Sequence, residues 1–475
     1  MEKAVNTMFV YRAGDRQIAY VPGFHKLFNI SKEVATVVRL LNRKKSVEEV
    51  AKISGFPRDR IEEIVRWYES EASPKKPSPL SDNRAKAVSK LVLLTTTFCN
   101  LDCRYCYAAG GSYRATPTKM DVGTAERILE YFITVCGFSH IGGITFFGGE
   151  PLLNYQAIEF VCHKIVELHN NNSLDALPRF AVITNGTILN GKILNLLRAY
   201  NISVTISIDG EKDVHDRLRP YKSGRGSFER VLRNVDELRR VWPDCQLHYE
   251  ATYTQLHLDK NMNMEDLRRQ IEALTGICKG VVIPVMENSS ACEDSDWRLK
   301  NAADVKAEDV ELVWQELSKG RFRNEETVIQ FLRQLTNKAP VPRICDFGSS
   351  IFAVDPRGDI YPCHMLVGID GQKIGSVFSE EPIFQTALHR RFSRSIAFVN
   401  KDSKKCWHCI ARDFCFGCPA RWYFESGTLR PPNKFCNSSK KYVMKFLYRL
   451  LELRSDPERW RTFLRAFLAN DNALS

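Results

Sequence analysis

Long apolar runs are missing from this chain. No stretch of 18 or more apolar residues occurs, which excludes a membrane-spanning helix, and the N-terminus lacks the apolar core of a secretory signal. We therefore expect a cytoplasmic protein that has no membrane partner. In that reducing compartment the 15 cysteines are not expected to form disulfides. We interpret those that fall into patterned groups as metal ligands.

An acidic character is also missing. Lysine and arginine outnumber aspartate and glutamate by 68 to 56, a formal net charge of +12. A basic surface attracts polyanions, including nucleic acid, anionic cofactors and acidic peptides. The basic residues are spread along the whole chain, so the net charge does not indicate which of these partners the protein binds. The length of 475 residues and the hydrophobic fraction of 44% are typical of a globular protein with several domains.

The stretch 91–107 carries the first cysteine group. The apolar, β-branched run 91–98 predicts a buried strand, and Cys99, Cys103 and Cys106 follow in a C-x3-C-x2-C spacing. Three soft thiolates on one loop suit zinc or an iron–sulfur cluster and leave a fourth position open. Zinc sites usually space their cysteines in C-x2-C pairs, so zinc is the less typical occupant. Thiols that are merely packed, or that hold a structural ion, are the alternative.

This cysteine loop resembles that of the radical SAM enzymes. In that family the three cysteines hold a [4Fe–4S] cluster whose open iron binds S-adenosylmethionine (SAM). The resemblance implies that Cys99, Cys103 and Cys106 are the cluster ligands and catalytic residues. It also implies that Tyr105 lies beside the adenine of SAM.

The middle of the chain alternates between strand and helix patterns. After 91–98, strands are predicted at 143–147, 180–184, 203–208, 246–253 and 280–285, with amphipathic helical periods between them. Such repeats give a parallel sheet with right-handed crossovers. The predicted fold class is α/β, a partial (β/α)6 TIM barrel, with functional residues at the C-terminal ends of its strands.

Small and polar residues do follow these strands. Gly148, Gly149 and Glu150 end the second strand, and a carboxylate beside glycines can approach a ligand ammonium group closely. The sequence resembles the GGE motif of radical SAM enzymes, which implies contacts with the SAM amino group. Asn185 follows the third strand, where a small polar group suits a ribose or a carboxylate, and it is a further candidate SAM contact. The S-x-D-G…H-D-x-x-R pattern resembles that of SPASM-type radical SAM enzymes, which implies that Ser207 and Arg219 also contact SAM. Asp209 is interpreted as stabilising its own turn.

Residues 1–72 lack patterned cysteine. Short strands at 9–12, 17–21 and 27–30 precede three helices that begin near Ser31, Ser46 and Pro57. This order resembles the winged-helix-like recognition domain of ribosomal-peptide maturases, which binds the leader of a precursor peptide by strand addition. A winged helix that binds DNA, or that only packs on its neighbour, is the alternative.

A second cysteine group fills residues 345–436. A β-hairpin is predicted at Asp355–Gly358, between the first two of these cysteines. The seven cysteines are Cys345, Cys363, Cys406, Cys409, Cys415, Cys418 and Cys436. Their order resembles the SPASM domain, which implies two auxiliary [4Fe–4S] clusters, although that family usually has C-x3-C where Cys415 and Cys418 stand.

The resemblance also implies how these cysteines divide. Cys406, Cys409, Cys415 and Cys436 would hold the distal cluster, and Cys345, Cys363 and Cys418 the nearer one. Two cubanes with full cysteine ligation need one thiolate more than these seven. We hypothesise that the open iron binds the cysteine thiolate of the substrate. Cys292 filling the gap is the competing interpretation.

Residues around Cys363 indicate the reaction. The run Tyr361-Pro362-Cys363-His364 resembles thioether-forming ranthipeptide and sactipeptide maturases, whereas sulfatase-maturing enzymes carry an Asp base where His364 stands. The resemblance implies an enzyme that links cysteine thiols to carbon atoms of a precursor peptide. It also implies an external electron donor such as flavodoxin or ferredoxin, and no nucleic-acid partner.

Two rival functions stay open. Another SPASM peptide modification, such as a carbon–carbon crosslink, epimerisation or decarboxylation, would use the same residues. A zinc-dependent nucleic-acid-binding protein would explain the positive charge and the C-x2-C pairs, but not the first cysteine group or the GGE motif. The expected order is leader recognition, linker, radical SAM barrel, helical bridge, SPASM domain and C-terminal helices, at 1–72, 73–90, 91–300, 301–344, 345–436 and 437–475.

Overall fold

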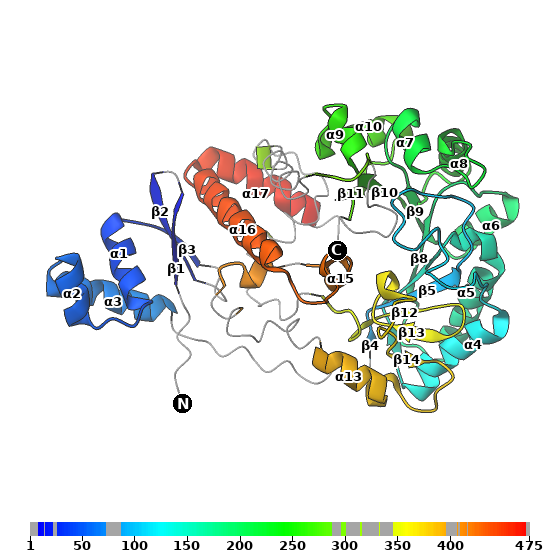
Figure 1. The fold of residues 1–475 in the computed structure, drawn as a ribbon, viewed down its shortest axis with the longest axis horizontal. Helices are drawn as coiled ribbons and strands as arrows, with labels where there is room; N and C mark the ends of the chain where they lie inside the picture. Colours follow the sequence, from blue (N-terminus) through cyan, green and yellow to red (C-terminus); the bar gives the residue numbers. More distant parts are fainter. Residues whose placement is uncertain are drawn as a thin grey trace.

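The computed structural model describes most of the chain in three visible parts. Figure 1 shows a small N-terminal unit in blue, a large α/β unit in cyan and green, and the C-terminal helices in orange and red between them. The described residues are 8–13, 15–21, 26–72, 87–286, 296–300, 314–315, 332, 345–395, 406, 409–415 and 417–471. Cys292 and nearly all of the predicted helical bridge at 301–344 lie outside them.

The N-terminal unit contains the strands and helices that the sequence predicts. Its sheet has the order β1-β2-β3 with both pairs antiparallel, formed by β1 (Phe9–Ala13), β2 (Arg16–Val21) and β3 (Lys26–Ile30). The helices are α1 (Lys32–Leu41), α2 (Val47–Ser54) and α3 (Arg58–Ala72). Ser31 caps α1, and Ser46 with Glu49 forms a capping box on α2, so hydroxyl groups satisfy backbone N–H groups that the helices leave open.

Both faces of this small sheet are covered. Ala19 and Val21 of β2 pack with α1–α3, whereas Ile18 and Tyr20 point the other way and pack with the C-terminal helix α16 (Asn433–Arg454). Tyr20 lies 5.9 Å from Phe414, measured between ring centroids. Because side chains alternate across a strand, one strand joins the N-terminal helices to the C-terminal part of the chain.

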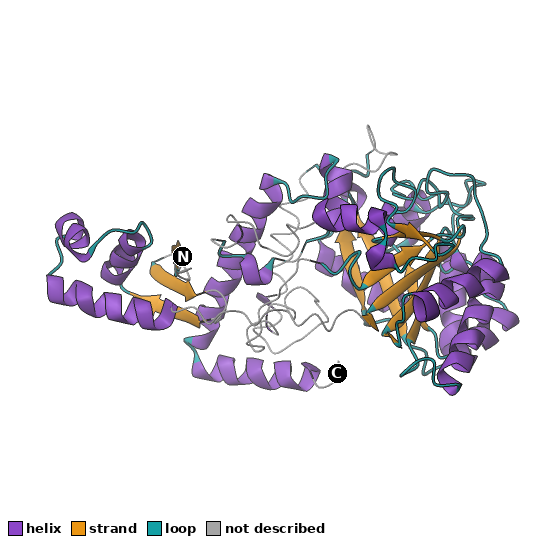
Figure 2. Ribbon diagram, turned by 90° about the horizontal axis from the view of Figure 1, so that it is seen from below, coloured by secondary structure: helices purple, strands orange, loops and turns teal. Residues whose placement is uncertain are grey.

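The α/β unit is built on six consecutive parallel strands in the order β5-β7-β8-β9-β10-β11. They follow one another in the sequence as well as in the sheet, which is the arrangement that successive βα units produce. Figure 2 shows the strands surrounded by helices. The bounds are β5 (Lys90–Thr96), β7 (Gly143–Gly148), β8 (Arg179–Thr184), β9 (Ser203–Ser207), β10 (Leu247–Tyr253) and β11 (Gly280–Pro284).

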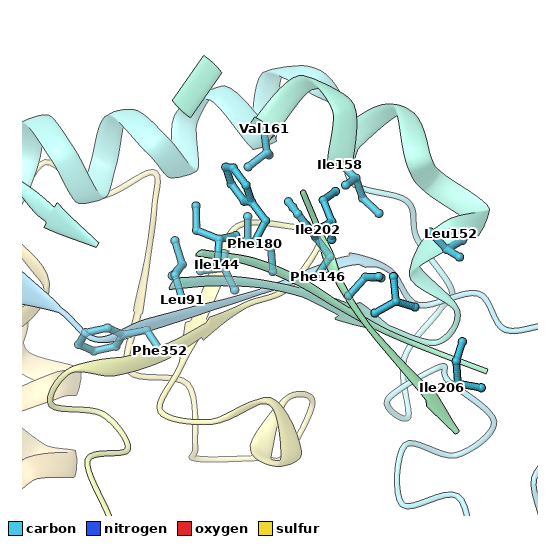
Figure 3. Close-up of a cluster of buried hydrophobic side chains, with 14 of the residues drawn as sticks. Leu91, Ile144, Phe146, Leu152, Ile158, Val161, Phe180, Ile202, Ile206 and Phe352 are labelled. Atoms are coloured by element: carbon cyan, nitrogen blue, oxygen red, sulfur yellow. The ribbon is translucent and has the colours of Figure 1, made fainter. Parts of the chain in front are cut away.

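Helices cover the outer face of this sheet. The largest buried core joins the two layers, and Figure 3 shows Leu91, Ile144 and Phe146 of the strands facing Ile158 and Val161 of a helix. These apolar contacts exclude water from one face of the sheet, and a second buried cluster that includes Val92, Leu94 and Ala353 lies on the other face. The helices are α4 (Val122–Glu130), α5 (Tyr155–Asn170), α6 (Gly191–Ala199), α7 (Lys212–Leu218), α8 (Phe228–Val241), α9 (Gln255–Asp259) and α10 (Met264–Thr275).

Three strands from the cysteine-rich region continue the same sheet. The predicted hairpin is present as β12 (Ile351–Val354) and β13 (Asp359–Tyr361), and β12 also pairs in parallel with β5. With β14 (Gly375–Ser376) the sheet reaches nine strands. The pairing of β12 with β5 was not predicted from the sequence, because the two strands are separated by about half of the chain. A small separate sheet pairs β4 (Ala87–Val88) with β6 (His140–Ile141).

The remaining helices follow the sheet. They are α13 (Ala387–Ser395), α15 (Pro419–Ser426), α16 and α17 (Pro457–Asp471). Short turns of helix lie at Tyr131–Val135, Pro151–Asn154, His364–Leu366, Ile383–Gln385 and Arg412–Phe414. Within the described ranges no helix is both long and apolar enough to cross a bilayer.

Candidate functional site

The first cysteine group lies just beyond the C-terminal end of β5. Its loop is held against the end of α7, since the backbone N–H groups of Asp102 and Arg104 donate to the carbonyls of Pro220 (2.8 Å) and Leu218 (2.9 Å). The N–H of Cys106 donates to the carbonyl of Cys103 at 3.1 Å, which closes a turn between two of the thiols. Backbone hydrogen bonds therefore hold the cysteine-bearing segment in place.

The three thiols gather in one place. Burial raises the pKa of Cys99 to about 11, with smaller contributions from the nearby Glu150 and Cys106. Burial likewise raises the pKa of Cys103 to about 12, with smaller contributions from Cys106 and Cys99. Mutual repulsion of this kind disfavours three free thiolates, whereas binding to a cationic cluster would stabilise them.

A single metal ion and an iron–sulfur cluster need different spacings of their ligands. No three His, Cys, Asp or Glu side chains in the described part of the chain converge closely enough to hold one metal ion. A cubane places its thiolates on separate iron atoms, so it accepts more widely spaced sulfurs. The ligand role of these cysteines stays a prediction.

The glycine pair after β7 brings the backbone against the cysteine loop. Gly148 has a φ of +138°, and a Cβ there would lie 2.1 Å from the carbonyl oxygen of Thr96. A Cβ on Gly149 would lie 2.3 Å from the carbonyl oxygen of Phe98. Neither position has room for a side chain, so glycine is needed to place Glu150 beside Cys99.

The Glu150 carboxylate is fully buried, with an exposed fraction of 0%. It accepts hydrogen bonds from the backbone N–H of Asn185 at 2.7 Å and of Leu152 at 3.0 Å, and from the Thr184 hydroxyl at 2.8 Å. Burial raises the pKa of this carboxyl, and the hydrogen bonds act in the opposite direction. Glu150 thus joins the ends of β7 and β8.

Asn185 forms a second link between the strand ends and the cysteine loop. Its Nδ2 donates to Oδ1 of Asn100 at 2.9 Å and lies 3.9 Å from Sγ of Cys99. Its Oδ1 accepts from the backbone N–H of Thr187 at 3.0 Å. Two sides of its amide are occupied within the protein, so in this structure Asn185 positions the loop.

Arg219 reaches Tyr105 and Asp209. Its Nη1 donates to the hydroxyl of Tyr105 at 2.6 Å, and that hydroxyl donates to Oδ2 of Asp209 at 2.5 Å. Ser207 ends β9 two residues before Asp209 and is half-buried. The predicted SAM-contacting residues therefore lie at the C-terminal ends of β7, β8 and β9, on the cysteine loop and at the end of α7. The sequence interpretation missed Asp209, which it confined to its own turn.

The second cysteine group forms two sets. Burial raises the pKa of Cys363 to about 12 and that of Cys345 to about 11, and Cys418 contributes to both shifts. Cys406 and Cys436 in turn affect the pKa of Cys409, which burial raises. Six of the seven thiols thus lie near one another, as 345, 363 and 418 in one set and 406, 409 and 436 in the other.

Aromatic side chains separate the first cysteine group from Cys363. Tyr107 lies 6.3 Å from Tyr113 and 6.4 Å from His364, measured between ring centroids, and the Tyr113 hydroxyl donates to the Gly148 carbonyl at 3.3 Å. Nδ1 of His364 lies 3.7 Å from Sγ of Cys363. Burial lowers the pKa of His364 to about 4, so the imidazole is neutral near pH 7. No sequence spacing indicated this contact between distant loops.

Comparisons with known proteins find a family model that matches part of this chain. Residues 93–274 match the Radical SAM superfamily. The Cysteine-type anaerobic sulfatase-maturating enzyme of Clostridium novyi is 26% identical over 382 residues, covering 77% of this chain and 96% of that enzyme. An uncharacterized protein of Methanocaldococcus jannaschii is 39% identical over 145 residues, 30% of this chain and 46% of that protein.

A solved structure has a similar fold. The structure of anSMEcpe with bound AdoMet has a TM-score of 0.61 at 19% identity, and the match covers 79% of this chain and 98% of that chain. The central sheet and its helices are therefore a radical SAM α/β fold. SAM and one [4Fe–4S] cluster are the cofactors that this family uses, and the residues around Cys99 fit both.

Proposed function

We propose that this radical SAM enzyme is a peptide maturase that joins cysteine thiols to carbon atoms of acceptor residues in a ribosomally synthesised precursor peptide. The product would be a thioether of the ranthipeptide or sactipeptide kind. One observation carries the proposal. The first cysteine group follows β5 and Cys363 follows β13 of the same sheet, and Cys363 adjoins a neutral His364.

The first group would hold the cofactors. Cys99, Cys103 and Cys106 are the proposed cluster ligands, and Tyr105, Gly148, Gly149, Glu150, Asn185, Ser207 and Arg219 the proposed surroundings of SAM. When bound, the cluster and SAM supply one-electron chemistry that can break a C–H bond. Glu150 would accept hydrogen bonds from an ammonium group, and Arg219 would donate to a carboxylate.

The second group would hold the auxiliary clusters. Cys345, Cys363 and Cys418 lie together, and we propose them as ligands of the nearer cluster, with Cys406, Cys409, Cys415 and Cys436 on the distal one. A thiolate of the substrate would complete the nearer set, since a metal-bound thiol is deprotonated. Two further expectations belong to this proposal, namely flavodoxin or ferredoxin as the electron donor and a cytoplasmic location.

A peptide substrate is supported by the relatives and by the N-terminal unit. The Clostridium novyi relative is named as a sulfatase-maturating enzyme, and anSMEcpe has been solved with a peptide, Cp18Cys. Within the described residues β3 pairs with β2 alone, so it is an edge strand of this sheet. We propose that the leader of the precursor adds a strand there.

Sulfatase maturation is the second candidate, because the named relatives carry it out. It is less favoured here because His364, whose pKa burial lowers to about 4, stands where an Asp base is expected in those enzymes. A neutral imidazole that lies against Cys363 and packs on Phe147 at 4.8 Å offers a different acid–base group.

The test is co-expression with cysteine-containing peptides encoded beside the gene, followed by mass spectrometry. Each C–S link replaces one C–H and one S–H bond, so a thioether appears as the loss of two hydrogen atoms per link with no free thiol left on that cysteine. Cys99→Ala should abolish this change. Replacement of sulfur by oxygen in the peptide would instead indicate sulfatase-type maturation and would contradict the proposal.

A further inference from the structure

Asp209 is the centre of a buried hydrogen-bond network at the end of β9. Its exposed fraction is 0%. Oδ1 accepts from the backbone N–H of Thr252 on β10 at 2.8 Å, and Oδ2 accepts from the Tyr105 hydroxyl at 2.5 Å. One carboxylate therefore joins a neighbouring strand to the cysteine loop.

Two histidines fix the backbone of Asp209. Its N–H donates to Nδ1 of His215 at 3.2 Å, and its carbonyl oxygen lies 3.0 Å from Nε2 of His257. The Nε2 of His215 lies 3.0 Å from the Ser227 hydroxyl, which donates to the Arg219 carbonyl at 2.6 Å. Asp209 and Arg219 are thus held through their backbones as well as through their side chains. Side chains with this many hydrogen-bond partners have little freedom to rotate.

The Arg219 guanidinium is held in place, but not all of its N–H groups have an acceptor. Its exposed fraction is 8%, its Nη1 donates to Tyr105 and lies 3.9 Å from Oδ2 of Asp209, and its Nε has no acceptor among the described residues. An unpaired buried N–H on a guanidinium costs free energy unless a ligand supplies an oxygen. The Cys103 thiol lies close enough to influence the pKa of Arg219, which places this open donor beside the first cysteine group.

The Tyr105 hydroxyl lies between the two charges. It donates to Asp209 and accepts from Arg219, so its orientation is fixed at both ends. Its ring and that of Trp297 are arranged edge to face, with their centroids 6.4 Å apart. In this arrangement the polar end of Tyr105 serves Arg219, which differs from a role limited to stacking on a nucleobase.

We propose that Asp209 and Tyr105 are positioning residues that hold the Arg219 guanidinium toward the carboxylate of SAM. This inference rests on one part of the proposed function, the contact between Arg219 and SAM, and is independent of the thioether chemistry. Asp209 orients Tyr105, Tyr105 orients Arg219, and the open Nε of Arg219 meets the ligand.

The experiment measures dissociation constants of the reconstituted full-length chain for SAM and for decarboxylated SAM, which lacks only the carboxylate. Tyr105→Phe and Asp209→Asn should each weaken SAM binding by about 10- to 100-fold, the effect of losing one hydrogen bond to a charged group. Binding of decarboxylated SAM should change little. Tyr253→Phe is the matched control, because it removes a buried hydroxyl that donates to the Met262 carbonyl and keeps the ring that stacks on His257.

A double-mutant cycle tests whether the two residues act through Arg219. In an Arg219→Gln background, adding Tyr105→Phe should cause no further loss of SAM affinity, because the group that it positions is gone. Iron content and the thermal midpoint, measured on every variant, separate a positioning role from a loss of fold or cluster.

Three results would overturn the inference. The first is unchanged SAM affinity in Tyr105→Phe, and the second is equal weakening for both ligands. The third is a full additional loss in the Arg219→Gln background. If Asp209→Asn does not fold, Tyr105→Phe decides alone. Absence of crosslinking in the peptide assay would end the proposed function and leave this binding experiment valid.

Discussion

Gly368 lies so close to Tyr113 that a Cβ added to the glycine would sit 2.1 Å from the tyrosine carbonyl oxygen. Tyr113 belongs to the loop that follows the first cysteine group, and Gly368 belongs to the loop that follows Cys363. Both residues adopt positive φ, +53° and +71°. The two loops therefore meet backbone to backbone, and a side chain at position 368 would force them apart.

This contact predicts a difference between two nearby glycines. Gly368→Ala and Gly371→Ala both place alanine at positive φ, +71° and +74°, but nothing lies within 4 Å of a Cβ at Gly371. We expect Gly371→Ala to destabilise the chain by about 1 kcal/mol, the cost of the left-handed backbone. Gly368→Ala should cost about 1–3 kcal/mol more because of the overlap. Thermal unfolding of both variants measures this, and equal midpoints would contradict the contact.

A second glycine pair tests the packing of the cysteine loop. A Cβ on Gly111 would lie 2.7 Å from Cα of Gly149 and 2.8 Å from Cβ of Cys99, whereas a Cβ on Gly110 meets nothing within 4 Å. Gly111→Ala should therefore displace Cys99 and lower the iron that the chain retains after reconstitution. Gly110→Ala also has positive φ and serves as the control, with iron content near that of the original protein. Full iron retention in Gly111→Ala would show that the loop tolerates the shift.

Glu150 predicts a contrast between removing a carboxylate and replacing it with an amide. Glu150→Ala leaves two buried backbone N–H groups and the Thr184 hydroxyl without their acceptor, at about 1–3 kcal/mol for each group left unpaired. Glu150→Gln keeps one acceptor oxygen and should recover part of that loss. Chemical denaturation of the two variants gives the free energies of unfolding. A Glu150→Gln variant less stable than Glu150→Ala would argue against this account.

Buried histidines predict a pH dependence of stability. Burial lowers the pKa of His215 well below its usual value, and its Nδ1 accepts a hydrogen bond from Asp209, so the folded chain holds it neutral. The unfolded chain binds a proton near pH 6.5, where the folded chain does not, so stability falls as pH drops through that value. Thermal midpoints measured from pH 7.5 to 5.5 should decline, and the decline should be smaller in His215→Gln. An identical decline in both proteins would exclude His215 as a cause.

The sheet was largely predictable, because local patterns determine it. Strands such as β7 and β9 are short apolar or alternating runs followed by glycine or polar residues, and their order in the sheet is their order in the sequence. The pairing of β12 with β5 was not predictable in this way. Hydrophobic periodicity identifies a strand but contains no information about a partner that is hundreds of residues away.

Some residues of the candidate site could likewise be predicted from the sequence, and others could not. Cys99 and Glu150 belong to short motifs whose residues are close together in the sequence, so both could be identified from the sequence. Asp209 could not, because a carboxylate in a turn has the same sequence signature whether it caps its own backbone or orients a tyrosine from another loop. The position of Tyr107 near His364 depends on two loops that only the folded sheet brings together.

The addition of β12 and β13 to the central sheet affects the distance between the two cysteine-bearing loops. The hydrogen-bonded ladder from β5 through β12 to β13 links the strand that leads to Cys99 with the strand that leads to Cys363. Because these main-chain hydrogen bonds fix the positions of the strands, we expect the distance between the two cysteine-bearing loops to stay the same whatever binds between them. A bound molecule would have to adapt its own conformation to that distance. Its flexibility would then decide which of its atoms reach both cysteine-bearing loops.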